Sequence, residues 1–368
     1  MSSDVFYADM RAKKGASLLE KLERLYHRAG FASLFKPKDL VAIKLHFGER
    51  GNTAYIRPQF LRRIVDKVRT SGASPFLTDS NTLYVGSRSN AVDHLQTAIE
   101  NGFDYAVVNA PLVIADGLLG LDYETVRIDG KWFKEVKIGS ALVQADGIIS
   151  VAHFKGHGAA GFGGTLKNLG MGGASRSGKQ MQHSDVLPRV SAEKCKACQK
   201  CIRWCPASAI NIEERAAVIS EDRCIGCAEC TVVCPYHAIA INWKTEEGAL
   251  QEKIAEYTLG VLKSKEGKAG FISFVTDVSP DCDCCAWNDA PIVPDIGILA
   301  SKDPIALDCA CADLVNRTTA LRDSRLDENP ETSDKLRALN PEVNWKIQLE
   351  YGERLGLGTM DYRLIKVD

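Results

Sequence analysis

Apolar positions in the first 150 residues of the chain follow two alternating spacings. Residues 41–45 and 75–79 are short, mostly apolar runs, which predict buried strands. Between them, apolar residues of segment 58–72 recur at i, i+3, i+4 and i+7, which predicts an amphipathic helix with a proline at its first position. Residues 91–100 predict a second helix. This alternation predicts an α/β fold with a mostly parallel sheet.

The same alternation continues toward the C-terminus. A hairpin is predicted at 127–133, where Asp129 and Gly130 stand between apolar flanks. The remaining predicted elements are a central strand at 146–151, a helix at 246–262, strands at 271–275 and 292–299, and a helix that begins at Pro304 with Asp303 as its N-cap.

A cysteine-rich stretch at 188–243 interrupts the α/β pattern. The simplest organisation is one discontinuous α/β ligand-binding domain, residues 1–187 and 244–368, with a small α+β module inserted at 188–243. Insertion at a surface loop costs little, because closure entropy grows only slowly with loop length. In the alternative, three domains in series, the residues after 243 would have to build a core of their own.

Composition narrows the class of protein. Apolar residues make up 45% of the chain, charged residues 25%, and the formal net charge is −1, which predicts no strong attraction to nucleic acid or to an anionic membrane. The N-terminus lacks a signal-peptide pattern, and no apolar run reaches the length of about 18 residues that spans a bilayer. Thirteen cysteines, most of them at metal-ligand spacing, suit a reducing compartment. We therefore expect a cytoplasmic protein.

Eight of the cysteines form two copies of one motif. Each copy spells C-x2-C-x2-C-x3-C-P, and the copies are offset by 29 residues. Such a run supplies three thiolates to one iron–sulfur cluster and one to another. Zinc is the alternative ligand of C-x2-C pairs, but four tetrahedral ligands would leave the third cysteine and the Cys-Pro of each run unexplained.

The repeat extends past the cysteines, since Pro206, Ala209 and Ile210 recur 29 residues later. In these features the segment resembles bacterial two-cluster ferredoxins, which hold two [4Fe–4S] clusters. The resemblance implies one cluster on Cys195, Cys198, Cys201 and Cys234, and a second on Cys224, Cys227, Cys230 and Cys205.

A glycine-rich segment follows the strand predicted at 146–151. It holds nine glycines between 156 and 178, which we expect to be too many for a helix. Its exposed backbone N–H groups and its cationic side chains are typical of an anion-binding site. The ligand expected there is a flavin, another phosphate-bearing cofactor or an anionic substrate. The alternative is a flexible loop and, for Lys44 and His46, which share a strand face, a paired polar edge. The candidate binding residues are His153, Lys155, His157, Gly163, Gly164, Lys167 and Asn168, with Lys44 and His46 across the crevice.

A second cysteine group comprises Cys282, Cys284 and Cys285, with Cys309 on the helix that begins at Pro304. Three interpretations stay open: a third metal site, a redox-active thiol, or small buried side chains.

Across nearly its full length the chain resembles the domain of unknown function 362 family with a ferredoxin module. The segments that carry the resemblance are 155–157, 164–168, 281–284 and 303–308, together with the cysteine repeat. The resemblance implies an α/β fold and two clusters but no reaction.

The function predicted from these features is an iron–sulfur electron-transfer oxidoreductase, in which two [4Fe–4S] clusters relay electrons to an anion bound at the glycine-rich segment. Its partner is a redox protein or a small-molecule substrate. A non-enzymatic electron carrier and an iron–sulfur redox sensor are the alternatives.

Overall fold

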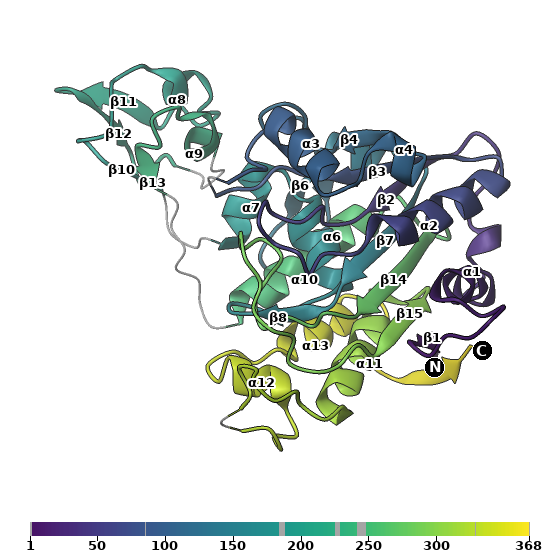
Figure 1. The fold of residues 1–368 in the computed structure, drawn as a ribbon. Helices are drawn as coiled ribbons and strands as arrows, with labels where there is room; N and C mark the ends of the chain where they lie inside the picture. Colours follow the sequence, from purple (N-terminus) through teal and green to yellow (C-terminus); the bar gives the residue numbers. More distant parts are fainter. Residues whose placement is uncertain are drawn as a thin grey trace.

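A mixed sheet forms the centre of the computed structural model, which describes residues 2–84, 86–183, 188–224, 229–240, 248–327 and 329–367. Within that part of the chain the sheet has eight strands in the order β16-β1-β15-β14-β7-β2-β3-β4 (Figure 1). Only β15 runs against its neighbours, so the predicted α/β fold with a mostly parallel sheet is confirmed. The strands are β1 (Ser3–Asp9), β2 (Leu40–Lys44), β3 (Ser74–Asp79), β4 (Leu112–Ile114), β7 (Gly147–His153), β14 (Ala269–Val275), β15 (Gly297–Ser301) and β16 (Tyr362–Lys366).

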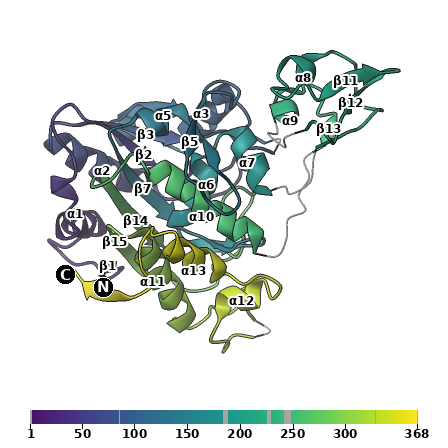
Figure 2. The ribbon, with the colours of Figure 1, turned by 180° about the vertical axis from the view of Figure 1, so that it is seen from behind.

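Helices cover both faces of this sheet, as Figures 1 and 2 show from opposite sides. Successive residues of a strand point to opposite faces, so Ile149 of β7 joins one core and Ile148 the other. Both faces are therefore apolar, which explains the continuous apolar runs of the sequence. The helices are α1 (Leu18–Arg28), α2 (Pro58–Thr70), α3 (Ala91–Glu100), α4 (Tyr105–Val108), α5 (Ser140–Gln144), α6 (Thr165–Gly173), α7 (Arg176–His183), α10 (Ala249–Leu262), α11 (Pro304–Arg317), α12 (Lys335–Leu339) and α13 (Ile347–Arg354), with a 3-10 turn at Phe31–Ser33.

Two small hairpins flank the sheet. The hairpin predicted around Asp129 is present as β5 (Tyr123–Arg127) and β6 (Glu135–Gly139). A second hairpin, β8 (Lys155–His157) with β9 (Gly161–Gly163), was not predicted. The strand predicted at 292–299 begins only at Gly297, because Pro294 has no N–H to give to a ladder.

The cysteine-rich module preserves its sequence repeat in three dimensions. Strands β11 (Ile210–Glu213) and β12 (Ala216–Ile219) pair through Ile210 and Ile219, and 29 residues away β13 (Ile239–Ala240) and β10 (Arg189–Val190) pair through Ile239 and Val190. Two short helices, α8 (Lys200–Arg203) and α9 (Glu229–Val233), complete the module. Its junctions with the α/β domain at 184–187 and 241–247 lie outside the described residues, but strands from before and after it build the one sheet.

The glycine-rich segment is largely helical, which corrects the expectation that its glycines exclude a helix. Helices α6 and α7 contain several of these glycines, and close packing explains them. A Cβ on Gly170 of α6 would lie 2.1 Å from the carbonyl oxygen of Ile254 in α10. The N-terminus of α6 is capped from a distant helix, since the carboxylate of Asp308 in α11 accepts from the N–H groups of Thr165 (2.7 Å) and Leu166 (2.9 Å).

None of the helices in the described ranges combines the length and apolar character needed to cross a membrane.

We predict that Gly170→Ala destabilises the protein, although alanine is the better helix former. The added methyl group must push α6 away from α10, and such overpacking costs about 1–3 kcal/mol. Urea unfolding measures the loss. Gly158→Ala is the matched control, because the nearest atom to its Cβ would be 3.8 Å away, and it should change the free energy of unfolding by less than about 0.5 kcal/mol. Equal midpoints for the two variants would refute the packing argument.

Candidate functional site

A pocket of about 200 Å³ opens at the carboxyl edge of the sheet. Strands β2, β3 and β7 are parallel and end side by side, so the residues that follow them meet at this edge. Helices α6 and α7 close the other side. The lining residues are Lys44, His46, Asp79, Ser80, Thr82, Leu83, Tyr84, Arg88, His153, Lys155, His157, Gly164, Lys167, Asn168, Met171, Gly172, Lys179, His183 and Cys284.

The structure brings the predicted binding residues together here. Every one of them lines the pocket except Gly163. A Cβ on Gly163 would lie 3.2 Å from Cε of Lys155 and 3.3 Å from Cδ of Lys167. Its lack of a side chain lets these two lysines approach each other.

The pocket lining is strongly cationic. Among its described residues are five lysines or arginines, four histidines and a single carboxylate, Asp79. Lys179 donates to the hydroxyl of Ser80 and the carbonyl of Ala174, both at 2.6 Å. Burial lowers the pKa of this lysine, and the carboxylate of Asp116 opposes that shift. Such a lining is complementary to an anion.

One buried ion-pair network is built on Asp79 at the end of β3. Its Oδ1 lies 2.9 Å from Nζ of Lys44, and its Oδ2 lies 3.4 Å from Nη1 of Arg88. All three side chains are almost completely buried. Burial alone would raise the pKa of Asp79, but the charges around it, Lys44 first among them, hold that pKa well below its usual range.

A second buried network is built on Asp283. Its carboxylate lies 2.9 Å from Nδ1 of His153 and 2.9 Å from Nζ of Lys155. Burial alone would raise the pKa of Asp283, but these two partners lower it. The network fixes the loop after β14 against the end of β7 and the start of β8.

In two histidines of the pocket, Nδ1 accepts hydrogen bonds from the backbone, which leaves Nε2 as the donor. Nδ1 of His46 accepts from the N–H of Gly48 at 3.0 Å, and Nδ1 of His157 accepts from the N–H groups of Ala159 and Ala160 at 3.1 and 3.0 Å. Burial lowers the pKa of both rings. In the neutral form these bonds place the remaining proton on Nε2.

Lys167 is paired with sulfur. Its Nζ donates to Sγ of Cys282 at 3.2 Å. Burial alone would lower the pKa of Lys167, but the Cys282 thiolate raises it to about 12. Lys167 was predicted to bind the ligand. In the structure it lines the pocket but already has a partner within the protein, the sulfur of Cys282.

Cys309 does not join the other cysteines of the second group. It packs on the core from α11, and the charged groups that act on it are three carboxylates and Lys346 rather than the other cysteines of that group. Burial raises its pKa to about 12. Within the described ranges no three His, Cys, Asp or Glu side chains converge where they could hold one metal ion.

The residues of the site that were not predicted from the sequence include Asp79, Tyr84, Arg88 and Asp283. Asp79 ends a predicted strand beside Lys44 and could have been found by that position. Arg88 and Tyr84 come from a loop without regular spacing, so no pattern marked them.

A second cavity lies in the cysteine-rich module. Cys195, Cys198, Cys201 and Cys234 all line it, so three cysteines of the first run meet the last cysteine of the second. The repeat is matched in its hydrogen bonds, since the N–H of Ala209 donates to Sγ of Cys205 at 3.2 Å and that of Ala238 to Sγ of Cys234 at 3.3 Å. Cys227 lies outside the described residues.

Comparisons with known proteins give a family and a distant likeness. The family model described as "Domain of unknown function (DUF362)" matches residues 41–313. No curated protein matches the chain. The chain is similar to the lactate racemase apoprotein from Thermoanaerobacterium thermosaccharolyticum, at 14% identity and a TM-score of 0.36, over 75% of this chain and 51% of that one. It is also similar to a protein from Thermotoga maritima, at 11% identity and a TM-score of 0.37, over 70% and 49%. It thus spans about half the length of each of these two proteins.

We predict that Asp79→Asn destabilises the protein by about 3–5 kcal/mol near pH 7, because it leaves the buried ammonium of Lys44 without its counter-charge. Urea unfolding measures the effect. The control is Glu100→Gln, which breaks the exposed pair with Arg50 and should cost less than about 1 kcal/mol.

The same variant tests the pH dependence. Since the folded-state pKa of Asp79 lies below its unfolded value of about 4, its stabilisation is present above that pH and is lost as the pH falls toward the folded-state pKa. Between pH 5 and 3 the wild type should therefore lose more stability than Asp79→Asn. Parallel curves would contradict the assignment.

Proposed function

We propose that this chain, which belongs to the family described as "Domain of unknown function (DUF362)", is an iron–sulfur oxidoreductase that transfers electrons to a small anionic substrate in the cation-lined pocket. The observation that carries the proposal is the contact between helix α9 of the cysteine-rich module and helix α7, which lines that pocket.

The cysteine-lined cavity fits a [4Fe–4S] cluster by its donor set. Cys195, Cys198, Cys201 and Cys234 supply the four thiolates that such a cluster takes. Backbone N–H groups already point at the sulfurs, for example from Ala197 (3.4 Å) and Ala217 (3.3 Å) to Cys195. The repeat supports a second cluster on Cys224, Cys227, Cys230 and Cys205. Each cluster, when bound, supplies or accepts one electron.

Helix α9 joins the module to the pocket. Its buried residue Glu229 accepts from the hydroxyl of Tyr123 at 2.6 Å and from Nζ of Lys137 at 2.7 Å, both on the β5–β6 hairpin. The same helix carries Cys230 and packs against α7. Because Lys179 and His183 of α7 line the pocket, one helix contact separates a proposed cluster ligand from the substrate site.

The size of the pocket favours a small ligand. Pockets for drug-sized molecules and cofactors enclose about 300–1,000 Å³, whereas this one encloses about 200 Å³. A small carboxylate or phosphate is therefore favoured over a flavin. An electron carrier without a substrate would need no such group of buried cations, whose desolvation costs stability.

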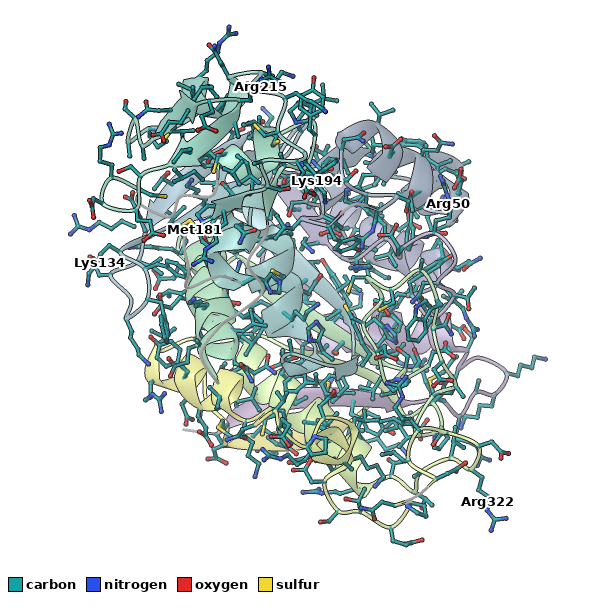
Figure 3. All side chains as sticks on the ribbon, turned by 90° about the vertical axis from the view of Figure 1, so that its left-hand side faces the viewer. Arg50, Lys134, Met181, Lys194, Arg215 and Arg322 are labelled. Atoms are coloured by element: carbon teal, nitrogen blue, oxygen red, sulfur yellow. The ribbon has the colours of Figure 1, made fainter. Side chains whose placement is uncertain are left out.

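The surface around the first cluster suits an acidic electron-transfer protein as redox partner. Cys198 is exposed, and Lys196 and Lys200 line the cavity beside it. Lys194 and Arg203 are exposed nearby, and the side chains of Lys194 and Arg215 are labelled in Figure 3. The module as a whole is nearly neutral, so this basic face is a local feature that steers an acidic partner.

Anaerobic purification and metal analysis test the proposal. We expect about eight iron and eight sulfide per chain, and about four of each in Cys198→Ser. Cys309→Ser is the control and should keep about eight. In the same preparations, isothermal titration with inorganic phosphate and small carboxylates should show at least one ligand whose affinity falls tenfold or more in Lys155→Met. Iron-free protein, or no anion bound by the wild type, would overturn the proposal.

Partner docking has its own test. An acidic ferredoxin should reduce the protein at a rate that falls steeply with salt. In Lys196→Glu/Lys200→Glu this rate should fall and lose most of its salt dependence, while Lys13→Glu/Lys14→Glu, on exposed residues of the α/β domain, should behave like the wild type. Equal rates for the two variants would rule out the basic face.

A further inference from the structure

The loop after β14 holds two neighbouring thiols in different environments. Sγ of Cys282 is buried and accepts from Nζ of Lys167 at 3.2 Å and from the N–H of Cys284 at 3.4 Å. Cys284 lines the substrate pocket. The first thiol is therefore held at a positive charge, and the second faces the site of reaction.

A tight turn keeps the two cysteines within reach of each other. The N–H of Cys285 donates to the carbonyl of Cys282 at 2.9 Å, which closes a turn over residues 282–285. Asp283, at the centre of that turn, is completely buried and paired with His153 and Lys155. Residues two apart in such a turn have the Cα separation that a disulfide requires, about 4.4–6.8 Å.

We propose that Cys282 and Cys284 form a dithiol–disulfide couple that collects two electrons, one from each cluster, and passes them as a pair to the ligand in the pocket. The couple rests on the proposed function for its supply of single electrons. Iron–sulfur clusters exchange electrons one at a time, whereas most organic substrates take them in pairs. The couple would bridge this difference between the clusters and the substrate.

The chemistry balances with the groups in place. Two electrons and one proton cleave the S–S bond and leave a thiolate on Cys282 and a thiol on Cys284. In the second step an oxidised substrate takes up the two electrons, the thiol proton and one further proton, and the S–S bond forms again.

The surroundings match this reduced state. The hydrogen bond from the Cys284 side chain lowers the pKa of Cys282, and Lys167 and His157 lower it further. The same bond raises the pKa of Cys284, which keeps its proton. The lysine that faces Cys282 is half-buried and donates to its sulfur, a contact that a cysteine that only fills space does not require.

The couple is tested on the full chain, purified anaerobically. Samples are equilibrated in buffers of increasing reduced-to-oxidised dithiothreitol ratio, alkylated, digested and examined by mass spectrometry. We expect Cys282 and Cys284 to gain alkylation together in one two-electron transition, with a 282–284 disulfide in the oxidised samples. Independent alkylation of the two at every ratio, or a disulfide to another cysteine, would overturn the couple.

Substitution of Lys167 should shift the midpoint of the transition between the 282–284 dithiol and disulfide. Lys167→Met removes the charge that stabilises the thiolate, so the midpoint should move to a dithiothreitol ratio at least about tenfold more reducing. Lys167→Arg keeps the charge and should shift it less, and Cys285→Ser should leave the 282–284 disulfide in place. An unchanged midpoint in Lys167→Met, with the fold intact by circular dichroism, would refute the role of the lysine.

Iron analysis of the same samples separates this inference from the proposed function. Protein with about eight iron and no 282–284 disulfide would refute the couple and leave the iron–sulfur function standing. Iron-free protein with the disulfide would refute the iron–sulfur function and the electron supply from the clusters, and would leave only a redox-active cysteine pair. When the iron-loaded, disulfide form is photoreduced with a deazaflavin, two thiols should appear per chain; clusters that stay reduced beside an intact disulfide would also refute the couple.

Discussion

Charge pairing inside a low-dielectric interior is the constraint on which this structure depends. Three strands end side by side and deliver lysines, histidines and carboxylates to one edge of the sheet, where the members of two ion-pair networks are buried. Lys44 is tolerable there because Asp79 lies 2.9 Å away, and Lys155 because Asp283 does. Each pair joins segments that are distant in sequence, so the site and the fold around it are stabilised by the same contacts.

The strands and most helices of the α/β domain could be predicted from apolar spacing, because buried strands leave continuous apolar runs. The bounds predicted for α3 agree with the structure, and α11 begins at Pro304 with Asp303 as its cap. Helices α6 and α7 could not be predicted. Their glycines lower helix propensity, and the reason they are tolerated, contact between α6 and α10, depends on a segment far along the chain.

The candidate site was predictable in part for a similar reason. Lys44 ends one strand and His46 follows it, and Lys155 to Asn168 follow another, so topology alone places them at one edge. The sequence could not show which side chains of the site contact one another. The partner of Lys167 is a cysteine more than a hundred residues away, so a lysine predicted to bind an anion donates to a sulfur atom of the protein itself.

The cap on α6 has a consequence for biosynthesis. The carboxylate of Asp308 satisfies the first N–H groups of that helix from α11, and α11 is translated well after the last cysteine of the module. On the ribosome, therefore, the cysteine-rich module is synthesised before the residue that caps α6. The order of translation makes its thiols available for the cluster loading proposed above while the C-terminal part of the α/β domain is still being made.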